Sequence, residues 1–264
     1  MEEPPPLPES ASHPPEGPKP PRTSLPARLL NVFAVPGEVF CEVKASAASA
    51  ANWLVPVLLL AIAGAVSAVI IFSQPAIQQQ IREQQSKVLD KQVQAGKMTR
   101  EQADQAIGMI EKFTGPTMLK IFGGVAAVMT SFVRVFWWAL VLWLFGKWFL
   151  KAQFDYAKTL EVAGLALMIS MLGTIVTVLL TVNLARMFAT PSLALAVHDF
   201  DATRKSHLFL GAANVFSVWQ VGVFAAGLAR LANVPFLRAA FLIFAYWFMQ
   251  ESFFILSGLG QFAL

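Results

Sequence analysis

Long runs of apolar residues alternate with polar segments along this chain. The longest run, residues 121–148, reads IFGGVAAVMTSFVRVFWWALVLWLFGKW and carries only two charges, Arg134 and Lys147. Such a run is too long for the core helix of a soluble domain and long enough to cross a bilayer with some tilt. Shorter runs of the same kind predict four further spans. We therefore expect five membrane spans, at about residues 53–72, 121–148, 160–184, 208–228 and 235–256.

The segments before the first span are polar or mixed. Residues 1–26 are rich in proline and bury too little apolar surface to offset the entropy of ordering, which predicts a disordered tail. An alternative is that its PPPLP stretch is a polyproline II ligand for an aromatic groove. Residues 27–51 mix apolar residues with sparse charges, and Pro36-Gly37 divides them into two pieces too short to span. We expect an interfacial helix that lies against the membrane.

The polar segment at residues 76–114 predicts a helical hairpin outside the bilayer. Gly96 ends the first helix, and Thr99 with Gln102 forms a capping box for the second. Apolar residues recur on one face of each helix. Two hypotheses remain open here: the hairpin folds against itself or the membrane surface, or it binds a partner protein.

Composition supports an all-α integral membrane protein. The chain is 56% hydrophobic and only 14% charged, whereas about a quarter of a soluble domain is charged. The net charge of +4 includes no basic block with interleaved aromatic residues, so we expect no nucleic-acid partner. The single cysteine, Cys41, excludes an internal disulfide and a site with several cysteine ligands.

The positions of the cations predict the orientation. Lysine and arginine near span ends favour the cytoplasmic side. If the N-terminus is inside, more cations lie near the inner span ends than near the outer span ends. This comparison leaves out the hairpin, whose cations are balanced by acidic residues. The inner set is Arg28, Lys44, Lys147, Lys151, Lys158, Arg230 and Arg238. We therefore expect a cytoplasmic N-terminus and a C-terminus on the opposite side.

The sequence contains no motif for catalysis, phosphate binding or a cofactor. It has no H-E-x-x-H, no Gly-x-Ser-x-Gly and no P-loop. The loop residues His198, Asp199, Asp201 and His207 suggest zinc at first sight, but their spacing fits no closed motif and a solvated polar loop explains them. We expect no enzyme activity, no cofactor and no metal site.

Six polar residues within the spans are the remaining candidates for a site. Arg134 and Glu251 lie deepest, and the opposite directions of their spans allow the two side chains to meet at one depth. Because a charge at the helix centre costs roughly 2.5–3.5 kcal/mol, a pair is favoured. Such a pair is either structural or part of a site for a transported solute or a lipid headgroup. The secondary candidates are Asn214 and Gln220, with Glu161 and Asn183 expected near the interfaces.

The order of these phrases resembles the YIP family of Ypt/Rab-interacting membrane proteins, in its prokaryotic branch. The phrase VFAVPGEVF precedes the first span, and FGKWFLKAQFDYAKTLEVAGLA follows the second. The fourth span carries NVFSVWQVGVFAAGLA, and an aromatic fifth span ends the chain. The resemblance covers about residues 29–256 and implies a five-span helical domain with a cytoplasmic N-terminus.

The resemblance also implies a function. Eukaryotic members of the family that this chain resembles look like non-enzymatic membrane organisers that bind Rab-type GTPases. Their Asp-Leu-Tyr-Gly-Pro phrase is missing here, since neither Tyr156 nor Tyr246 precedes glycine, so GTPase binding is not expected. We expect a membrane organiser or scaffold in a bacterial inner membrane, with lipids and a protein partner or a second copy as partners. The alternative is a small-solute or lipid transporter that uses the polar residues of the spans.

Overall fold

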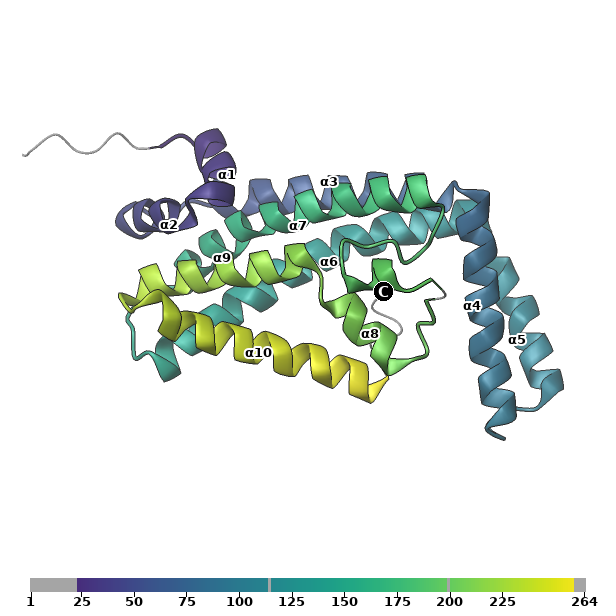
Figure 1. Ribbon diagram of the computed structural model, residues 1–264. Helices are drawn as coiled ribbons and strands as arrows, with labels where there is room; N and C mark the ends of the chain where they lie inside the picture. Colours follow the sequence, from purple (N-terminus) through teal and green to yellow (C-terminus); the bar gives the residue numbers. More distant parts are fainter. Residues whose placement is uncertain (1–22, 114, 199, 259–264) are drawn as a thin grey trace, which may run out of the picture.

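The described part of the chain, residues 23–113, 115–198 and 200–258 of the computed structural model, is a helical bundle (Figure 1). Five helices are long and apolar enough to cross a membrane. They are α3 (Ala51–Phe72), α6 (Pro116–Leu144) with its π-helical extension η1 (Phe145–Phe149), α7 (Tyr156–Leu184), α9 (Val215–Ala232) and α10 (Phe236–Ser257). The prediction of an all-α membrane protein with five spans is confirmed.

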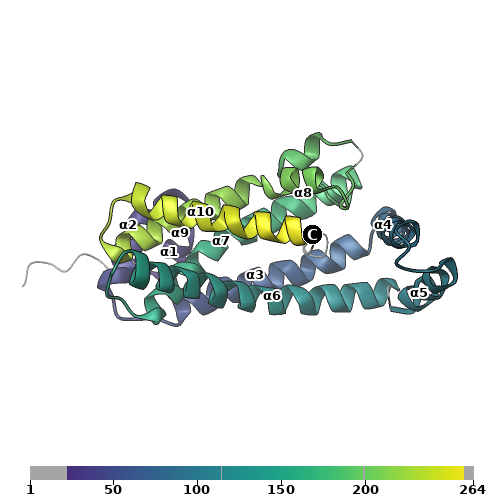
Figure 2. The same ribbon diagram turned by 90° about the horizontal axis from the view of Figure 1, so that it is seen from below.

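Helix α7 lies at the centre of the bundle. It contacts α3, α6 and α9, and every residue from Glu161 to Ile169 is buried. A helix that is apolar all round is expected where neighbours cover every face. Helix α10 packs on α9 at the edge of the bundle, and Figure 2 shows α3 and α6 side by side along the opposite edge.

Small residues let the spans approach closely, as expected in membranes where packing drives association. A Cβ on Gly64 of α3 would lie 2.9 Å from Ala127 Cβ of α6, and one on Gly123 would lie 3.1 Å from Ala68 Cβ. Gly164 of α7 is tighter still, because its Cβ would lie 2.2 Å from Trp53 Cα, which is backbone and cannot yield. The small residues Gly64 and Ala68 of α3 therefore pack against α6.

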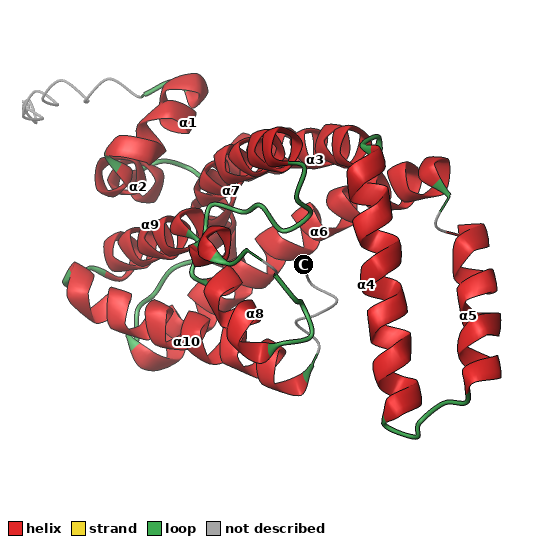
Figure 3. Ribbon diagram, turned by 45° about the vertical axis from the view of Figure 1, so that its right-hand side comes forward, coloured by secondary structure: helices red, strands yellow, loops and turns green. Residues whose placement is uncertain are grey.

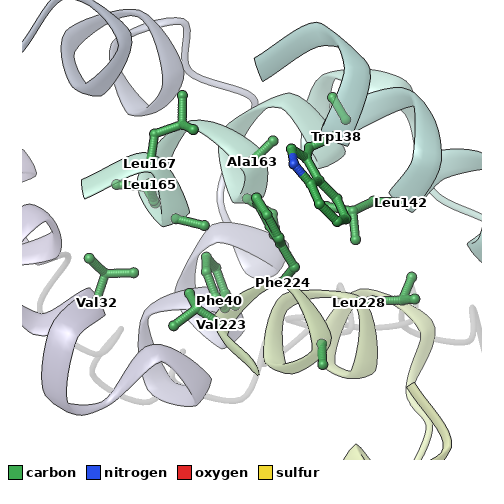
Figure 4. Packing of buried hydrophobic residues seen from close by; sticks show 14 of the residues in the cluster. Val32, Phe40, Trp138, Leu142, Ala163, Leu165, Leu167, Val223, Phe224 and Leu228 are labelled. Carbon is green, nitrogen blue, oxygen red and sulfur yellow. The ribbon is translucent and has the colours of Figure 1, made fainter. Parts of the chain in front are cut away.

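Two short helices precede the first span, as the Pro36-Gly37 break predicts. Helix α1 covers Leu25–Ala34 and α2 covers Pro36–Ala45. Their apolar face is covered by protein, since Val32, Phe40 and Val43 have no exposed surface and both helices contact α7. Figure 4 shows Phe40 between Val223 and Phe224 of α9 and the α7 residues near Leu165. Helices α1 and α2, which we expected to lie against the membrane, thus pack their apolar face into the core of the bundle.

The hairpin consists of α4 (Pro75–Gln94) and α5 (Arg100–Phe113). Gly96 adopts a positive φ of 67°, which glycine tolerates, and the capping box is formed. Thr99 Oγ1 accepts from Gln102 N at 3.2 Å, and Gln102 Oε1 accepts from Thr99 N at 2.9 Å. Figures 1 and 3 show the hairpin at the end of the bundle opposite α1 and α2, which we call the hairpin end.

The fourth apolar segment differs from the expected continuous span over residues 208–228. It is divided into α8 (Lys205–Ala212) and α9, which begins at Val215. Asn214 causes the break, because its Oδ1 accepts the Phe216 amide at 2.9 Å and caps α9. The chain at residues 190–193 pairs with this break, with Val215 N donating to Pro191 O at 3.1 Å.

The two ends of the bundle predict a labelling result. Ala47, in the exposed link between α2 and α3, and Lys97, in the exposed hairpin turn, are separated by the single span α3. Ala47→Cys and Lys97→Cys, each with Cys41→Ser, should react with an impermeant maleimide from opposite faces of the membrane. The Cys41→Ser parent is the blank, and labelling of both positions from one face would remove α3 as a span.

Candidate functional site

Arg134 joins three spans through hydrogen bonds near the middle of α6. Its Nη1 donates to Ser170 Oγ of α7 at 3.5 Å, and Ser170 Oγ donates to Gln220 Oε1 of α9 at 2.8 Å. Gln220 Nε2 donates to Ala166 O of α7 at 3.4 Å. The chain Arg134–Ser170–Gln220 thus gives the intramembrane cation a polar route into the centre of the bundle.

Glu251 of α10 reaches the same place from the other side. It lines two of the cavities that Arg134 lines. The ion pairs within 4.0 Å among the described side chains do not include this pair. The structure therefore places the two candidates around a common space and leaves room between them.

Three cavities meet at Arg134, with volumes of about 310, 230 and 400 Å³. Their polar lining comes from five spanning helices and the 190–214 region, namely Ser67, Thr130, Ser170, Thr174, Thr177, Thr190, Asn214, Ser217, Gln220, Gln250 and Glu251. Ionisable side chains within membranes usually face such polar cavities. Non-helical backbone is also tolerated within a membrane protein where it lines a polar cavity. The break between α8 and α9 at Asn214 lines these cavities. The site can hold water or a small polar group.

The other secondary candidates have separate roles. Asn214 lines the cavities but caps α9, and it shares no direct hydrogen bond with Arg134. Asn183 is exposed and donates to Leu179 O of its own helix at 2.7 Å. Glu161, which we expected near an interface, lies in the second turn of α7 and has no exposed surface. Its place in the structure is a second polar cluster.

This second cluster, the Glu161 network, joins α1 and α2 to the spans. Glu161 Oε1 lies 3.0 Å from Lys158 Nζ, and Oε2 accepts from Asn52 Nδ2 at 2.5 Å. Asn52 Oδ1 accepts from Arg28 Nη1 at 3.5 Å, and Arg28 Nε lies 3.6 Å from Glu42 Oε2. The network therefore contains residues of α1, α2, α3 and α7, all at the end opposite the hairpin.

Lys158 connects the Glu161 network to the end of α2. Its Nζ also donates to Val43 O at 2.6 Å and Ser46 O at 2.7 Å, which are carbonyls at the end of α2. A cation at a helix C-terminus is favourable because the helix dipole is negative there. The spacing of Lys158 and Glu161 by three residues was a signal in the sequence, but nothing there showed that α2 covers both.

The loop that suggested a metal site is held by hydrogen bonds. Asp201 N donates to His207 Nδ1 at 2.9 Å, and Asp201 Oδ1 accepts from Thr203 N at 2.9 Å. Among the residues that the structure describes, no three histidine, cysteine, aspartate or glutamate side chains are grouped to hold a metal. Asp199 lies outside the described residues.

The fold and these clusters define a five-span helical membrane protein whose ends are both occupied by extra helices. A family model described as the Yip1 domain matches residues 30–259, which is most of the chain. The chain therefore belongs to the Yip1 family, and the resemblance of its apolar phrases to that family is confirmed. No curated protein and no solved structure matches it significantly.

The shared cavity predicts coupling between Arg134 and Glu251. Arg134→Leu and Glu251→Leu should each lower the melting temperature in detergent, because each leaves the other charge without its counter-charge. Since no direct ion pair is formed, we expect a coupling energy of only about 1 kcal/mol, within the range for side chains that share a network or cavity. The double variant should therefore recover part of the summed loss.

A control double-mutant cycle separates this coupling from a general loss of stability. Asn183→Leu changes an exposed polar residue outside the cavities, so its effect should add to that of Arg134→Leu. If the losses in the Arg134 and Glu251 cycle were equally additive, the two charges would not communicate across the cavity.

Proposed function

We propose that this Yip1 family protein is a non-enzymatic membrane organiser that holds a protein partner, or a second copy of itself, through the outer helix of its hairpin. The observation that supports this most is the asymmetric docking of the hairpin. Helix α4 is fastened to the bundle, while α5 lies on the outer side of α4, where Figures 1 and 3 show it facing away from the spans.

Helix α4 contacts the segment after α7 at two points, one near its start and one near its end. Near its start, Gln80 Nε2 donates to Ala185 O at 2.7 Å and Gln80 Oε1 accepts from Met187 N at 2.9 Å. Near its end, Lys91 Nζ lies 3.6 Å from Asp201 Oδ2. These contacts tie α4 to the segment that follows α7, so the hairpin has a fixed direction relative to the spans.

The Asp201 anchor depends on pH in a defined direction. Burial alone would raise the pKa of Asp201, but hydrogen bonds from Thr203 and the charge of Lys91 bring it below its ordinary value. A carboxyl whose folded pKa is lowered stabilises the fold above its unfolded pKa, about 3.9 for aspartate. This stabilisation is lost as the pH falls through the lowered folded value. The anchor is therefore fully present at neutral pH.

Helix α5 offers a surface that the bundle does not use. Its inner face is covered at Ala103, which is 2% exposed, whereas Met109 is 60% exposed. Gln102 and Gln105 are exposed on the same side as Met109. A flexible thioether among polar side chains is typical of adaptable protein-binding surfaces. Helix α5 is thus the extramembrane element that we assign to partner binding.

We place the protein in a bacterial inner membrane with its N-terminus in the cytoplasm. The support is the gathering of cations at the end of the bundle that carries α1 and α2, where Lys44, Lys158 and Arg230 lie close together. The hairpin then lies on the outer side. The missing GTPase-binding phrase of eukaryotic members is consistent with a prokaryotic role.

A transporter is the second function that the sequence allows, and the family match does not favour it. The cavities at Arg134 are the only feature of the described residues that we would assign to transport. Flux in reconstituted vesicles that falls in Arg134→Leu, with the fold intact, would support that function over the organiser.

A photocrosslinker at Gln105 tests the organiser directly. In growing cells it should join α5 to one specific protein, and Met109→Glu should reduce that product at least about tenfold because it places a charge in an apolar contact. Light scattering on the purified complex separates a second copy from a different partner. Gln94→Glu is the control, because it adds the same charge at the exposed end of α4.

The control should leave the crosslinked product unchanged. If Gln105 gave no specific product, or if Met109→Glu and Gln94→Glu reduced it equally, α5 would not be the binding surface.

A further inference from the structure

A groove lies between α2 and the turn that joins α9 to α10, at the end of the bundle opposite the hairpin. Its volume is about 810 Å³. It is lined by Gly37, Cys41, Lys44 and Ala45 of α2 and by residues from Ala226 to Phe236. Two spans meet in the turn at Asn233, so the groove lies at the level where the bilayer ends.

The polar side of the groove carries two cations. Lys44 Nζ donates to Arg230 O at 3.0 Å and to Asn233 Oδ1 at 2.6 Å, which leaves one of its three N–H groups free of these acceptors. The Arg230 guanidinium lies over Gly37, where a Cβ would be 3.2 Å from Nη2. Within the described ranges, no carboxylate lies within 4.0 Å of either cation.

The absence of a side chain at Gly37 has a direct effect on this arrangement. It lets the guanidinium approach the backbone of α2 closely, and both cations line the same groove. An arginine fork and an ammonium together match the oxygens of a phosphate, since the fork can bind two oxygens at once and the ammonium acts as a point charge.

The other side of the groove is apolar and continues to the outside of the bundle. It is formed by Ala226, Ala229, Val234, Pro235 and Phe236. Phe236 is 53% exposed and its neighbour Leu237 is 79% exposed, so this wall is continuous with the surface that faces lipid. A ligand that fits both sides has an anionic head and an apolar tail.

We propose that this groove binds the phosphate headgroup of an anionic phospholipid, with an acyl chain against Val234 and Phe236. The lipid would then contact α2 and the α9–α10 turn together. Its negative charge would compensate Lys44 and Arg230 at the one level of the membrane where both an anionic head and an apolar chain are available. The proposal is independent of the partner assigned to α5.

Native mass spectrometry of the full-length protein tests the proposal. Protein taken from nanodiscs with equal phosphatidylglycerol and phosphatidylcholine should retain phosphatidylglycerol preferentially. Arg230→Gln should lower that preference at least about tenfold, because a charge-assisted contact to phosphate is lost. Arg238→Gln is the matched control: it removes the same charge at the start of α10, outside the groove, and should keep the preference.

The natural sequence supplies a second readout, because its own cysteine can report on the groove. Cys41 lines the groove and is the only cysteine in the chain. Maleimide should label it more slowly in phosphatidylglycerol nanodiscs than in phosphatidylcholine nanodiscs, and Arg230→Gln should remove the difference. Inorganic phosphate added to phosphatidylcholine nanodiscs should not slow the reaction.

Three results would overturn the assignment. One is an equal loss of phosphatidylglycerol in Arg230→Gln and Arg238→Gln. Another is the same Cys41 labelling rate in both lipids. The third is slowing by inorganic phosphate to the same extent as by phosphatidylglycerol, which would make the ligand a soluble anion and remove the lipid.

Discussion

Glu161 is a carboxylate with no exposed surface in the central helix of a membrane bundle, held by Lys158 at 3.0 Å and by Asn52 at 2.5 Å. A buried charge is tolerated only when it is paired and hydrogen-bonded, and removing one partner leaves the other uncompensated. Here the partners belong to separate parts of the fold. Asn52 lies in the first turn of the first span, and Lys158 donates to carbonyls at the end of α2. Through these two partners, this one side chain connects the spans to the α1–α2 end of the bundle.

The apolar contacts around Glu161 act in the same direction. Phe40 of α2 is fully buried beside Gly227, where a Cβ would lie 3.4 Å from its ring and 2.2 Å from Val162 Cγ1. Trp138 stacks on Phe224 with ring centroids 4.3 Å apart. The polar network fixes which helices meet, and the close packing excludes the water that would weaken it. The interfacial helices are therefore a part of the bundle.

Much of the fold could be predicted from the sequence because apolar length and turn chemistry act locally. The five spans, the Pro36-Gly37 break and the Thr99 capping box all depend on neighbouring residues. The division of the fourth segment could not be predicted in this way. Asn214 within an apolar run looks like a tolerated polar residue, but in the structure it caps α9, and the break is paired with residues 190–193. That pairing joins segments about twenty residues apart.

The candidate site was predicted in part for the same reason. Arg134 and Glu251 were singled out because charges are costly in a span, and the structure places them around one set of cavities. The hydrogen-bonded route from Arg134 through Ser170 had no sequence signal, since a serine in a span is common. Glu161 was placed at an interface because it starts an apolar run. Its burial depends on α1 and α2, whose position no local pattern shows.

The claim that Glu161 fixes the N-terminal helices is tested most directly by hydrogen exchange. In Glu161→Leu, amides of α1 and α2 should exchange at least about tenfold faster than in the natural sequence, while those of α10 should not change. Breaking a buried pair costs roughly 3–5 kcal/mol in soluble proteins, so the effect should be measurable even if a membrane reduces it. Unchanged exchange in α1 and α2, or equal acceleration in α10, would contradict this role of Glu161.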